Sequence, residues 1–199
     1  MGVREQVSRS HVGQSHVVQF FDSDDSRHEA VGGFLAEGYR RGGPLIVVAR
    51  SVNAEPILKQ LEKMVGYIHR HIASGRILVL DAAETLRRIS RTGAVDGGRF
   101  DEVIGTAIIR MAGKGRPYAY GEMVDILAQR GDFDETILLE RLWNGLLARI
   151  HLSLMCGYSA AHFVSDGTRA ALRHVCAAHS SVRAESHDPL AAWLLQQAQ

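Results

Sequence analysis

The chain has 199 residues and a formal net charge of +1, with 46% hydrophobic and 23% charged residues, a composition typical of one soluble globular domain. The small net charge disfavours a dedicated DNA-binding domain and gives no attraction to an anionic membrane. No apolar run approaches the roughly 20 residues that span a bilayer, and the N-terminus lacks the apolar core of a secretory signal. We therefore expect a cytoplasmic protein that contacts neither nucleic acid nor membrane directly.

Apolar runs alternate with amphipathic stretches, which predicts strands alternating with helices. Strands are expected at 16–21, 44–50, 76–81 and 151–158, and at the start of 117–127, which turns helical after its glycine. Helices are expected at 28–41, 82–91, 99–112 and 134–150. Two further helices are expected from their capping residues: one begins at Ser51 or Asn53, and the other begins at Asp166 and carries His179. A glycine-rich loop is expected at 92–98.

This alternation predicts an α/β fold with a mostly parallel β-sheet and helices on both faces. The runs at 44–50 and 76–81 are typical of strands that are buried on both sides of such a sheet. Ligands of these folds bind at the carboxyl ends of the strands, which gives the expected place of a site. One domain is expected at 15–183, after a disordered leader at 1–14 and before a tail at 184–199 whose short helix follows Pro189.

The first strand-to-helix junction, at 22–29, is where a nucleotide-binding protein of this class carries its phosphate loop. The junction reads DSDDSRHE and has neither the glycines nor the lysine of that loop. Asp22, Asp24 and Asp25 would repel a triphosphate, at about 1–4 kcal/mol for each close contact. We therefore expect no ATP hydrolysis and no enzyme. The acids could hold a cation, but a solvated turn with a capping aspartate is the favoured interpretation.

Cysteines and histidines predict no metal site, and the sequence predicts no cofactor. Cys156 and Cys176 lie far apart and form no CxxC pair, which indicates reduced thiols. The ten histidines show no zinc-type spacing. Cys156 is close in sequence to His151 and His162, but only the direction of the strand decides whether they meet, and a buried structural thiol is the favoured interpretation.

Glu140 and Asn144 lie one helical turn apart beside Trp143, so that a carboxylate, an amide and an indole share one region of the helix at 134–150. Together they could bind a small polar ligand by hydrogen bonds and stacking. The alternative is that Glu140 pairs with a local arginine, such as Arg141 or Arg116, and that Trp143 belongs to the core. Periodicity alone favours this alternative.

Glu122 follows a predicted strand and should lie near the crevice at the strand ends. Paired with Glu140, it would provide the two carboxylates of acid–base catalysis. No nucleophile with a partnered base accompanies them, because Ser153, Ser159 and Ser165 stand in no GxSxG-like context. No catalytic residue is therefore predicted.

Several segments resemble, in this order, the MEDS domain family: HVVQFFDSDD, FLAEGYRRGG, ILVLDAAETL, FDEVIGTAI, YGEMVDIL, LERLWN, LMCGY and VCAAHSSV. The resemblance runs from about His16 to Val182 and includes the unusual YGEM and LWN motifs. It implies a sensory domain, often found beside histidine kinases or DNA-binding regions, whose fold is a RecA/KaiC-like three-layer sandwich without a functional phosphate loop.

The resemblance also implies a ligand site near the crevice, built from the matching positions His16, Asp81, Glu122, Glu140, Trp143, Asn144 and Tyr158. Arg116, the local arginine named above, is a further candidate. The expected ligand is a small organic compound. The chain has only a short tail after Val182, so we expect the signal to leave through a partner protein such as a histidine kinase or transcription regulator, a homodimer surface, or the terminal helix with Trp193.

Three functions are therefore weighed. The leading hypothesis is a stand-alone sensory domain that binds a small molecule in a pocket near Glu122 and Glu140 and relays the signal by protein contacts. The second is a regulatory scaffold without a ligand, a pseudo-ATPase. The third is a nucleotide-hydrolysing enzyme.

Overall fold

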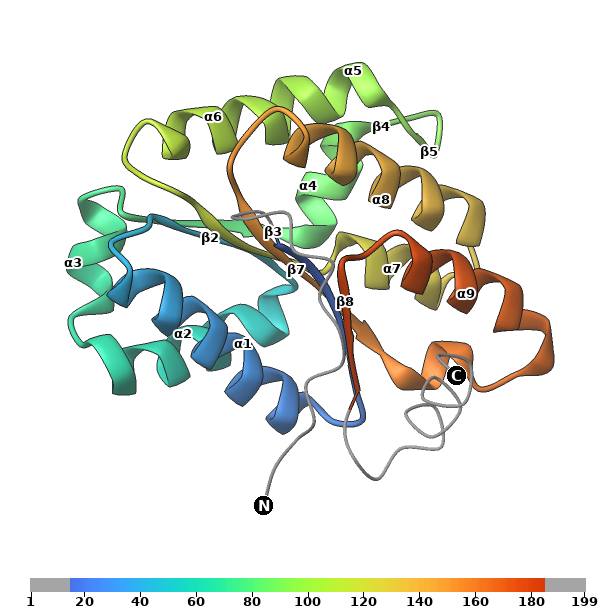
Figure 1. Ribbon diagram of the computed structural model, residues 1–199, viewed down its shortest axis with the longest axis horizontal. Helices are drawn as coiled ribbons and strands as arrows, with labels where there is room; N and C mark the ends of the chain where they lie inside the picture. The colour runs from blue at the N-terminus through green and yellow to red at the C-terminus, as the bar shows by residue number, and fades with distance from the viewer. Residues whose placement is uncertain (1–14, 185–199) are drawn as a thin grey trace.

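The computed structural model describes residues 15–184, which form three layers with helices on both faces of a six-stranded sheet (Figure 1). All neighbouring strands of the sheet are parallel, in the order β3-β2-β6-β7-β1-β8. The strands are β1 Ser15–Phe21, β2 Leu45–Ala49, β3 Ile77–Asp81, β6 Tyr118–Gly121, β7 Ser153–Ser159 and β8 Ser181–Arg183. The predicted fold class is confirmed. The leader expected at 1–14 and the helix expected after Pro189 lie outside the described residues.

Three helices cover one face of the sheet: α1 Asp24–Arg40, α2 Ser51–Val65 and α3 Ile68–Ala73. The other face carries α4 Ala82–Ile89, α5 Gly97–Phe100, a π-helical turn at Asp101–Gly105, α6 Thr106–Ala112, α7 Met123–Gln129, α8 Phe133–Leu147 and α9 Arg169–Ala177. A small antiparallel hairpin, β4 Ser90–Arg91 and β5 Ala94–Val95, forms where a glycine-rich loop was expected. Two 3-10 turns, Ala160–Phe163 and Asp166–Thr168, connect β7 to α9.

The central strands are buried on both sides because their side chains alternate between two cores. In β2, Leu45 and Val47 pack with α1, α2 and α3, whereas Ile46 and Val48 pack with the helices of the other face. Every residue of β2 is buried, which explains why the strand reads as an unbroken hydrophobic run.

Several sequence expectations about elements are wrong. The strand at 76–81 is not buried on both sides, because β3 is the edge of the sheet and most of it is half-buried. The helix expected at 28–41 begins earlier, at Asp24, since Ser23 caps it. The helix expected to carry His179 ends at Ala177, which leaves His179 in the connection to the unforeseen edge strand β8.

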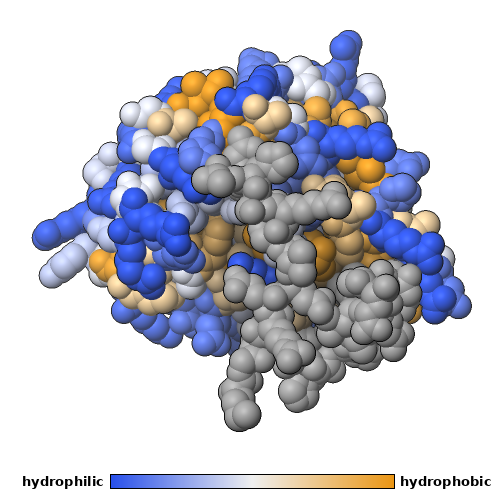
Figure 2. Space-filling view, in the orientation of Figure 1, coloured by the Kyte–Doolittle hydropathy of each residue, from blue (hydrophilic) through white to orange (hydrophobic). Residues whose placement is uncertain are grey.

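In the described part of the chain, no helix is both long enough and apolar enough to cross a bilayer. Figure 2 shows one face of the molecule, on which hydrophilic residues surround smaller hydrophobic areas.

The contact between α1 and β6 depends on a glycine. A Cβ atom at Gly38 would lie closer than 3.0 Å to the side chain of Tyr118, whereas a Cβ atom at Gly33 of the same helix would have no neighbour within 4 Å. We expect Gly38→Ala to destabilise the fold by about 1–3 kcal/mol through overpacking. Gly33→Ala should stabilise it by up to about 1 kcal/mol, because alanine favours the helix. Urea unfolding of both variants checks this, and equal midpoints would contradict the packing of α1 on β6.

Candidate functional site

The turn between β1 and α1 has only two residues, Asp22 and Ser23. The side chain of Ser23 accepts the backbone N–H of Ser26 at 3.2 Å and caps the helix. Asp24 and Asp25 are exposed in the first helical turn, where the helix dipole favours negative charge. The solvated acidic turn expected from the sequence is present, but a serine and not an aspartate caps it.

The carboxyl ends of β2 and β6 are joined by the buried carboxylate of Glu122. Its Oε1 accepts the hydroxyl of Tyr120 at 2.8 Å and the amide of Asn53 at 3.0 Å, and lies 3.5 Å from Arg27 Nη1. Its Oε2 accepts the backbone N–H of Arg50, the residue that follows β2, at 2.7 Å. Burial and the negative charge of Glu122 raise the pKa of the Tyr120 hydroxyl well above its usual value.

Asp125, in the first turn of α7, extends these contacts to β7. Its Oδ2 accepts Arg50 Nη1 at 2.6 Å, and its Oδ1 accepts the backbone N–H of Ser159 at 2.7 Å and lies 3.1 Å from His162 Nε2. Burial acts to raise the pKa of Asp125, but the hydrogen bond from His162 and the charge of Arg27 outweigh it and hold that pKa below its ordinary value.

Arg27, Arg50, Glu122 and Asp125 therefore form a strand-end network with two cations and two anions. The side chain of Arg27 is only 4% exposed and both carboxylates are fully buried. At Glu122 the expected crevice is thus filled by protein side chains, and the charges of the network compensate one another.

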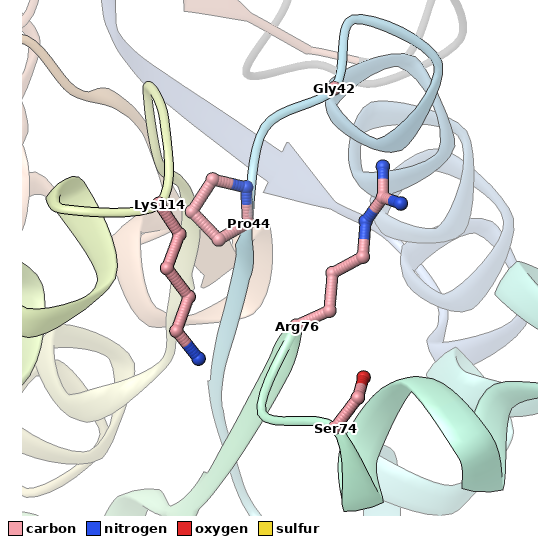
Figure 3. Close-up of a pocket in the computed structure, with 5 residues that line it drawn as sticks. All are labelled: Gly42, Pro44, Ser74, Arg76 and Lys114. Carbon is pink, nitrogen blue, oxygen red and sulfur yellow. The ribbon is translucent and has the colours of Figure 1, made fainter.

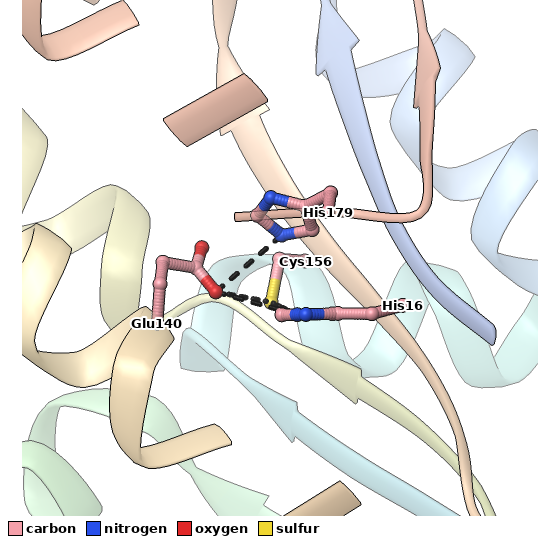
Figure 4. A group of neighbouring side chains, drawn as sticks. All are labelled: His16, Glu140, Cys156 and His179. Carbon is pink, nitrogen blue, oxygen red and sulfur yellow. Dashed lines mark hydrogen bonds and ion pairs between the residues drawn. The ribbon is translucent and has the colours of Figure 1, made fainter. Parts of the chain in front are cut away.

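A second polar group lies inside the layer between the sheet and helices α8 and α9 (Figure 4). We call it the His–Glu–Cys–His cluster: His16 from β1, Glu140 from α8, Cys156 from β7 and His179 from the connection between α9 and β8. Glu140 Oε2 lies 3.3 Å from His16 Nε2 and 3.4 Å from His179 Nε2. Cys156 Sγ lies 3.4 Å from Glu140 Oε2 and 3.4 Å from His16 Nε2.

The other ring nitrogens of both histidines are held by neighbouring groups. His179 Nδ1 donates to the backbone carbonyl of Val175 at 2.6 Å. His16 Nδ1 lies 2.9 Å from Asn144 Oδ1, and the amide of Asn144 donates to the carbonyl of Ala178 at 2.8 Å, which fixes its oxygen toward the ring. Both Nδ1 atoms therefore carry the ring proton, and both Nε2 atoms face Glu140.

The electrostatics of the cluster centre on the buried carboxylate. Burial acts to raise the pKa of Glu140, but the facing His179 and His16 outweigh it and hold that pKa far below its ordinary value. Burial acts to lower the pKa of His179, and the charge of Glu140 overcomes this and raises it. Burial and Glu140 raise the pKa of the Cys156 thiol well above its usual range. Glu140 is therefore held as a carboxylate and Cys156 as a neutral thiol, and protonation of His179 is favoured relative to a free imidazole.

The structure brings four of the eight candidate residues together. His16 and Glu140 belong to the cluster, Asn144 orients His16, and the Tyr158 hydroxyl donates to Glu140 Oε1 at 2.6 Å. The alternative in which Glu140 pairs with an arginine is wrong, because its partners are histidines, a thiol and a tyrosine hydroxyl.

The other four candidates lie elsewhere, so the expectation of one shared crevice is wrong. Trp143 is a core residue whose ring packs edge-to-face on Phe100, with centroids 5.2 Å apart. Asp81 ends β3 and caps α4. Arg116 precedes β6 at the opposite end of the strands and donates to the Ser153 hydroxyl at 2.6 Å. Glu122 belongs to the strand-end network.

Four residues of these two centres were not singled out as site candidates in the sequence: Arg27, Arg50, Asp125 and His179. Cys156 was interpreted as a structural thiol. Val18 of β1 pairs with Cys156 of β7, and this parallel register places His16 and Cys156 on the same face of adjacent strands. Strand order and register are non-local, so no spacing in the sequence reports them.

Two surface pockets of the described residues lie away from both centres. One, at the amino ends of β2 and β3, is lined by Gly42, Pro44, Ser74, Arg76 and Lys114 (Figure 3). Lys114 Nζ donates to the carbonyl of Gly75 at 2.7 Å, and Arg76 stacks on Tyr39 at 4.1 Å. A second lies between α6 and the end of α8, lined by Ile109 and Leu146 among others. Neither pocket is lined by Glu122 or Glu140, where a ligand pocket was expected.

A family model described as "MEDS: MEthanogen/methylotroph, DcmR Sensory domain" matches residues 15–187, which confirms the resemblance found in the sequence. Among solved structures, the KaiC-like protein PH0186 from the hyperthermophilic archaeon Pyrococcus horikoshii OT3 is similar to this chain, with a TM-score of 0.49 and 13% sequence identity. That similarity covers 76% of this chain and 65% of the other. No curated protein matches the chain.

The strand-end network predicts a pH-dependent stability. Because the folded pKa of Asp125 is below its unfolded value of about 3.9, its contribution is present above that pH and is lost as the pH falls through the folded pKa. We expect Asp125→Asn to cost about 3–5 kcal/mol at pH 7, since it leaves buried positive charge uncompensated. The cost should shrink below about pH 4.

The matched control is Asp24→Asn, because Asp24 also faces Arg27, at 3.7 Å, but is 72% exposed. It should cost less than about 1 kcal/mol at either pH. Urea unfolding at pH 7 and pH 3.5 measures both variants. A cost for Asp125→Asn that does not change with pH would refute the assignment.

Proposed function

Because the chain belongs to the MEDS family of sensory domains, we propose that it binds a small organic molecule and relays this signal through protein contacts. The observation that carries the proposal is the His–Glu–Cys–His cluster, in which one buried carboxylate contacts three other segments of the chain. Buried, mutually perturbed ionisable groups concentrate at functional sites, because their charge states respond to small changes around them.

The cluster supports a relay because it ties the last described helix and strand to the sheet. His179 and Ser180 both lie in the connection between α9 and β8. The backbone N–H of Ser180 donates to the His16 carbonyl at 2.8 Å, and the His16 N–H donates to the Ser180 hydroxyl at 3.0 Å. A ligand that changed the contacts of Glu140 would therefore act on His179 and on the position of α9 and β8.

A switch of this kind requires only a small coupling free energy between the ligand site and the α9–β8 segment. Coupling between two sites is typically about 1–3 kcal/mol, which is the scale of a few hydrogen bonds to charged groups. Such a ligand shifts the equilibrium only by its difference in affinity for the two arrangements of the α9–β8 segment.

The proposed output surface is the edge of the sheet at β8. The strand has three residues and is last in the sheet, with β1 as its neighbour within the described residues. Edge strands offer backbone groups to a strand of another chain. The partner we propose is a signalling protein, such as a histidine kinase or a transcription regulator, or a second copy of this chain.

One observation favours a second candidate, a regulatory scaffold without a ligand. Both carboxylate oxygens of Glu122 and of Glu140 already contact protein groups, so a ligand must displace them. In this case α9 and β8 would act through protein contacts alone. Ligand-induced stabilisation separates the two functions.

The ligand is sought by thermal shift with a library of small organic metabolites at millimolar concentration. A ligand present at 100 times its Kd stabilises the fold by about 2.7 kcal/mol. We expect the response of the wild type to fall at least tenfold in apparent affinity in Glu140→Gln. The matched control Glu135→Gln changes a glutamate of the same helix that lies outside the cluster and accepts the Val95 N–H at 2.6 Å, and it should respond like the wild type.

Hydrogen exchange with and without each hit then tests the relay. Residues 169–183 should change protection more than α1 and α2. Flat thermal responses throughout the library would favour the scaffold, and hits that Glu140→Gln leaves unaltered would move the site away from the cluster.

We propose further that the chain hydrolyses no nucleotide. A phosphate loop needs a run of backbone amides and a lysine between strand and helix, whereas β1 and α1 are separated by Asp22 and Ser23 alone. We expect millimolar ATP with Mg²⁺ to leave the melting temperature unchanged and to yield no phosphate above a protein-free control. Saturable stabilisation that Glu122→Gln abolishes would overturn this proposal.

A further inference from the structure

We propose that His16, Glu140, Cys156 and His179 bind a divalent transition-metal ion of the Zn²⁺ class. The inference deepens the proposed function and rests on it only for the ion's role in signalling, since metal binding is tested by itself. Three observations carry it: a shortage of hydrogen-bond donors, the spacing of the four ligand atoms, and the groups that orient them.

In the absence of an added proton or metal ion, the cluster has more acceptors than donors. Both histidines use their Nδ1 proton on neighbouring oxygens, so each neutral ring presents a bare Nε2 lone pair to Glu140. Glu140 Oε2 is also an acceptor, and the thiol of Cys156 is the only donor that the four groups offer without added protons. His179 Nε2 is buried and makes no hydrogen bond. A cation placed among these atoms would satisfy all of them.

The spacing of the four atoms fits tetrahedral coordination. Zinc bonds of about 2.0–2.3 Å to nitrogen, oxygen and sulfur imply separations of about 3.3–3.6 Å between ligand atoms. Glu140 Oε2 lies 3.3, 3.4 and 3.4 Å from the nitrogens of His16 and His179 and the sulfur of Cys156. All four atoms lie within 4.8 Å of one another, so small side-chain rotations would complete the geometry.

Surrounding groups orient the ligands as they do in protein metal sites. Metal-binding histidines usually donate their second ring nitrogen to a carbonyl or carboxylate oxygen. Here His179 donates to the Val175 carbonyl and His16 to the Asn144 amide oxygen. The Tyr158 hydroxyl holds the other oxygen of Glu140, which leaves Oε2 directed into the cluster (Figure 4).

The donor set selects the class of metal. Two imidazoles, a thiolate and a carboxylate match the nitrogen, sulfur and oxygen ligands of zinc, whereas Mg²⁺ and Ca²⁺ require oxygen ligands. Binding would release to solvent the thiol proton of Cys156 and, where His179 is protonated, the proton on its Nε2. A divalent ion with one carboxylate and one thiolate has no net charge, which is the least costly state for a site whose four side chains are buried.

The test uses the untagged chain, stripped of metal by a chelator and titrated with Co²⁺ alone. We expect one equivalent to bind, with a cobalt–thiolate charge-transfer band in the ultraviolet and tetrahedral bands in the visible. Zn²⁺ should displace the cobalt and raise the melting temperature. X-ray absorption of the zinc-loaded wild type should find one sulfur and three lighter ligands. No binding, or a first shell without sulfur, would overturn the proposal without any variant.

Matched variants locate the site. Cys156→Ser should lose the charge-transfer band and weaken binding at least tenfold, whereas Cys176→Ser, at a half-buried cysteine outside the cluster, should behave like the wild type. His179→Gln should weaken binding, and His162→Gln, at a histidine that faces Asp125 outside the cluster, should not. A band that survives in Cys156→Ser but not in Cys176→Ser would place the metal elsewhere and refute the site.

These experiments distinguish failure of the metal-site proposal from failure of the sensory proposal. If zinc binds at these residues while metabolites and hydrogen exchange show no response, the metal site stands and the sensory proposal fails. If metabolites act through Glu140 while cobalt and zinc do not bind, the sensory proposal stands and the metal site fails.

Discussion

Within the described residues, the fold has to compensate three buried carboxylates, and that of Glu140 is the one that faces histidines and no arginine. Transfer of such a charge from water costs several kcal/mol even after relaxation, so the folded state is stable only if other groups compensate this desolvation cost. The groups that contact Glu140 come from β1, β7 and the connection between α9 and β8. These three segments are distant in sequence and their strands are adjacent in the sheet. The position of the last described helix and strand is therefore coupled to the chemistry of a single side chain.

The two buried polar centres differ in charge balance, and this difference separates their roles. In the strand-end network, Arg27 and Arg50 offset Glu122 and Asp125, and the remaining oxygens accept backbone and side-chain donors. A balanced network of this kind fixes the ends of the strands and has no need of a ligand. In the His–Glu–Cys–His cluster with neutral rings the acceptors outnumber the donors, so an added proton, or the metal ion proposed above, would change its state. A site that can exist in two states is the element a sensory domain requires.

The sequence predicted what depends on local patterns and missed what depends on pairing. Continuous hydrophobic runs identified β1, β2, β6 and β7, since strands buried on both sides allow little polarity. Helical periodicity rightly placed Glu140 beside Asn144, one turn apart. The edge strand β8 was missed because three residues, two of them polar, carry no period. His179 acts from a turn, and it meets His16 only because β8 lies beside β1, a neighbour relation that no local pattern encodes.

The usual ligand crevice of this fold is closed by protein side chains, and the cluster lies at a different place in the sheet. Parallel sheets present ligands at the carboxyl ends of their strands, but here the side chain of Arg27 enters that space and the turn before it is too short to hold phosphate. The signal molecule proposed above must therefore reach the protein elsewhere. The cluster lies on β1, one strand from the edge, beneath a connection whose contacts run through His179, Ser180 and Ala178. Short edge elements open at lower free energy than the central sheet. For the ligand and the metal ion proposed above, local opening of this connection would give access to Glu140 while the five strands from β3 to β1 stay paired.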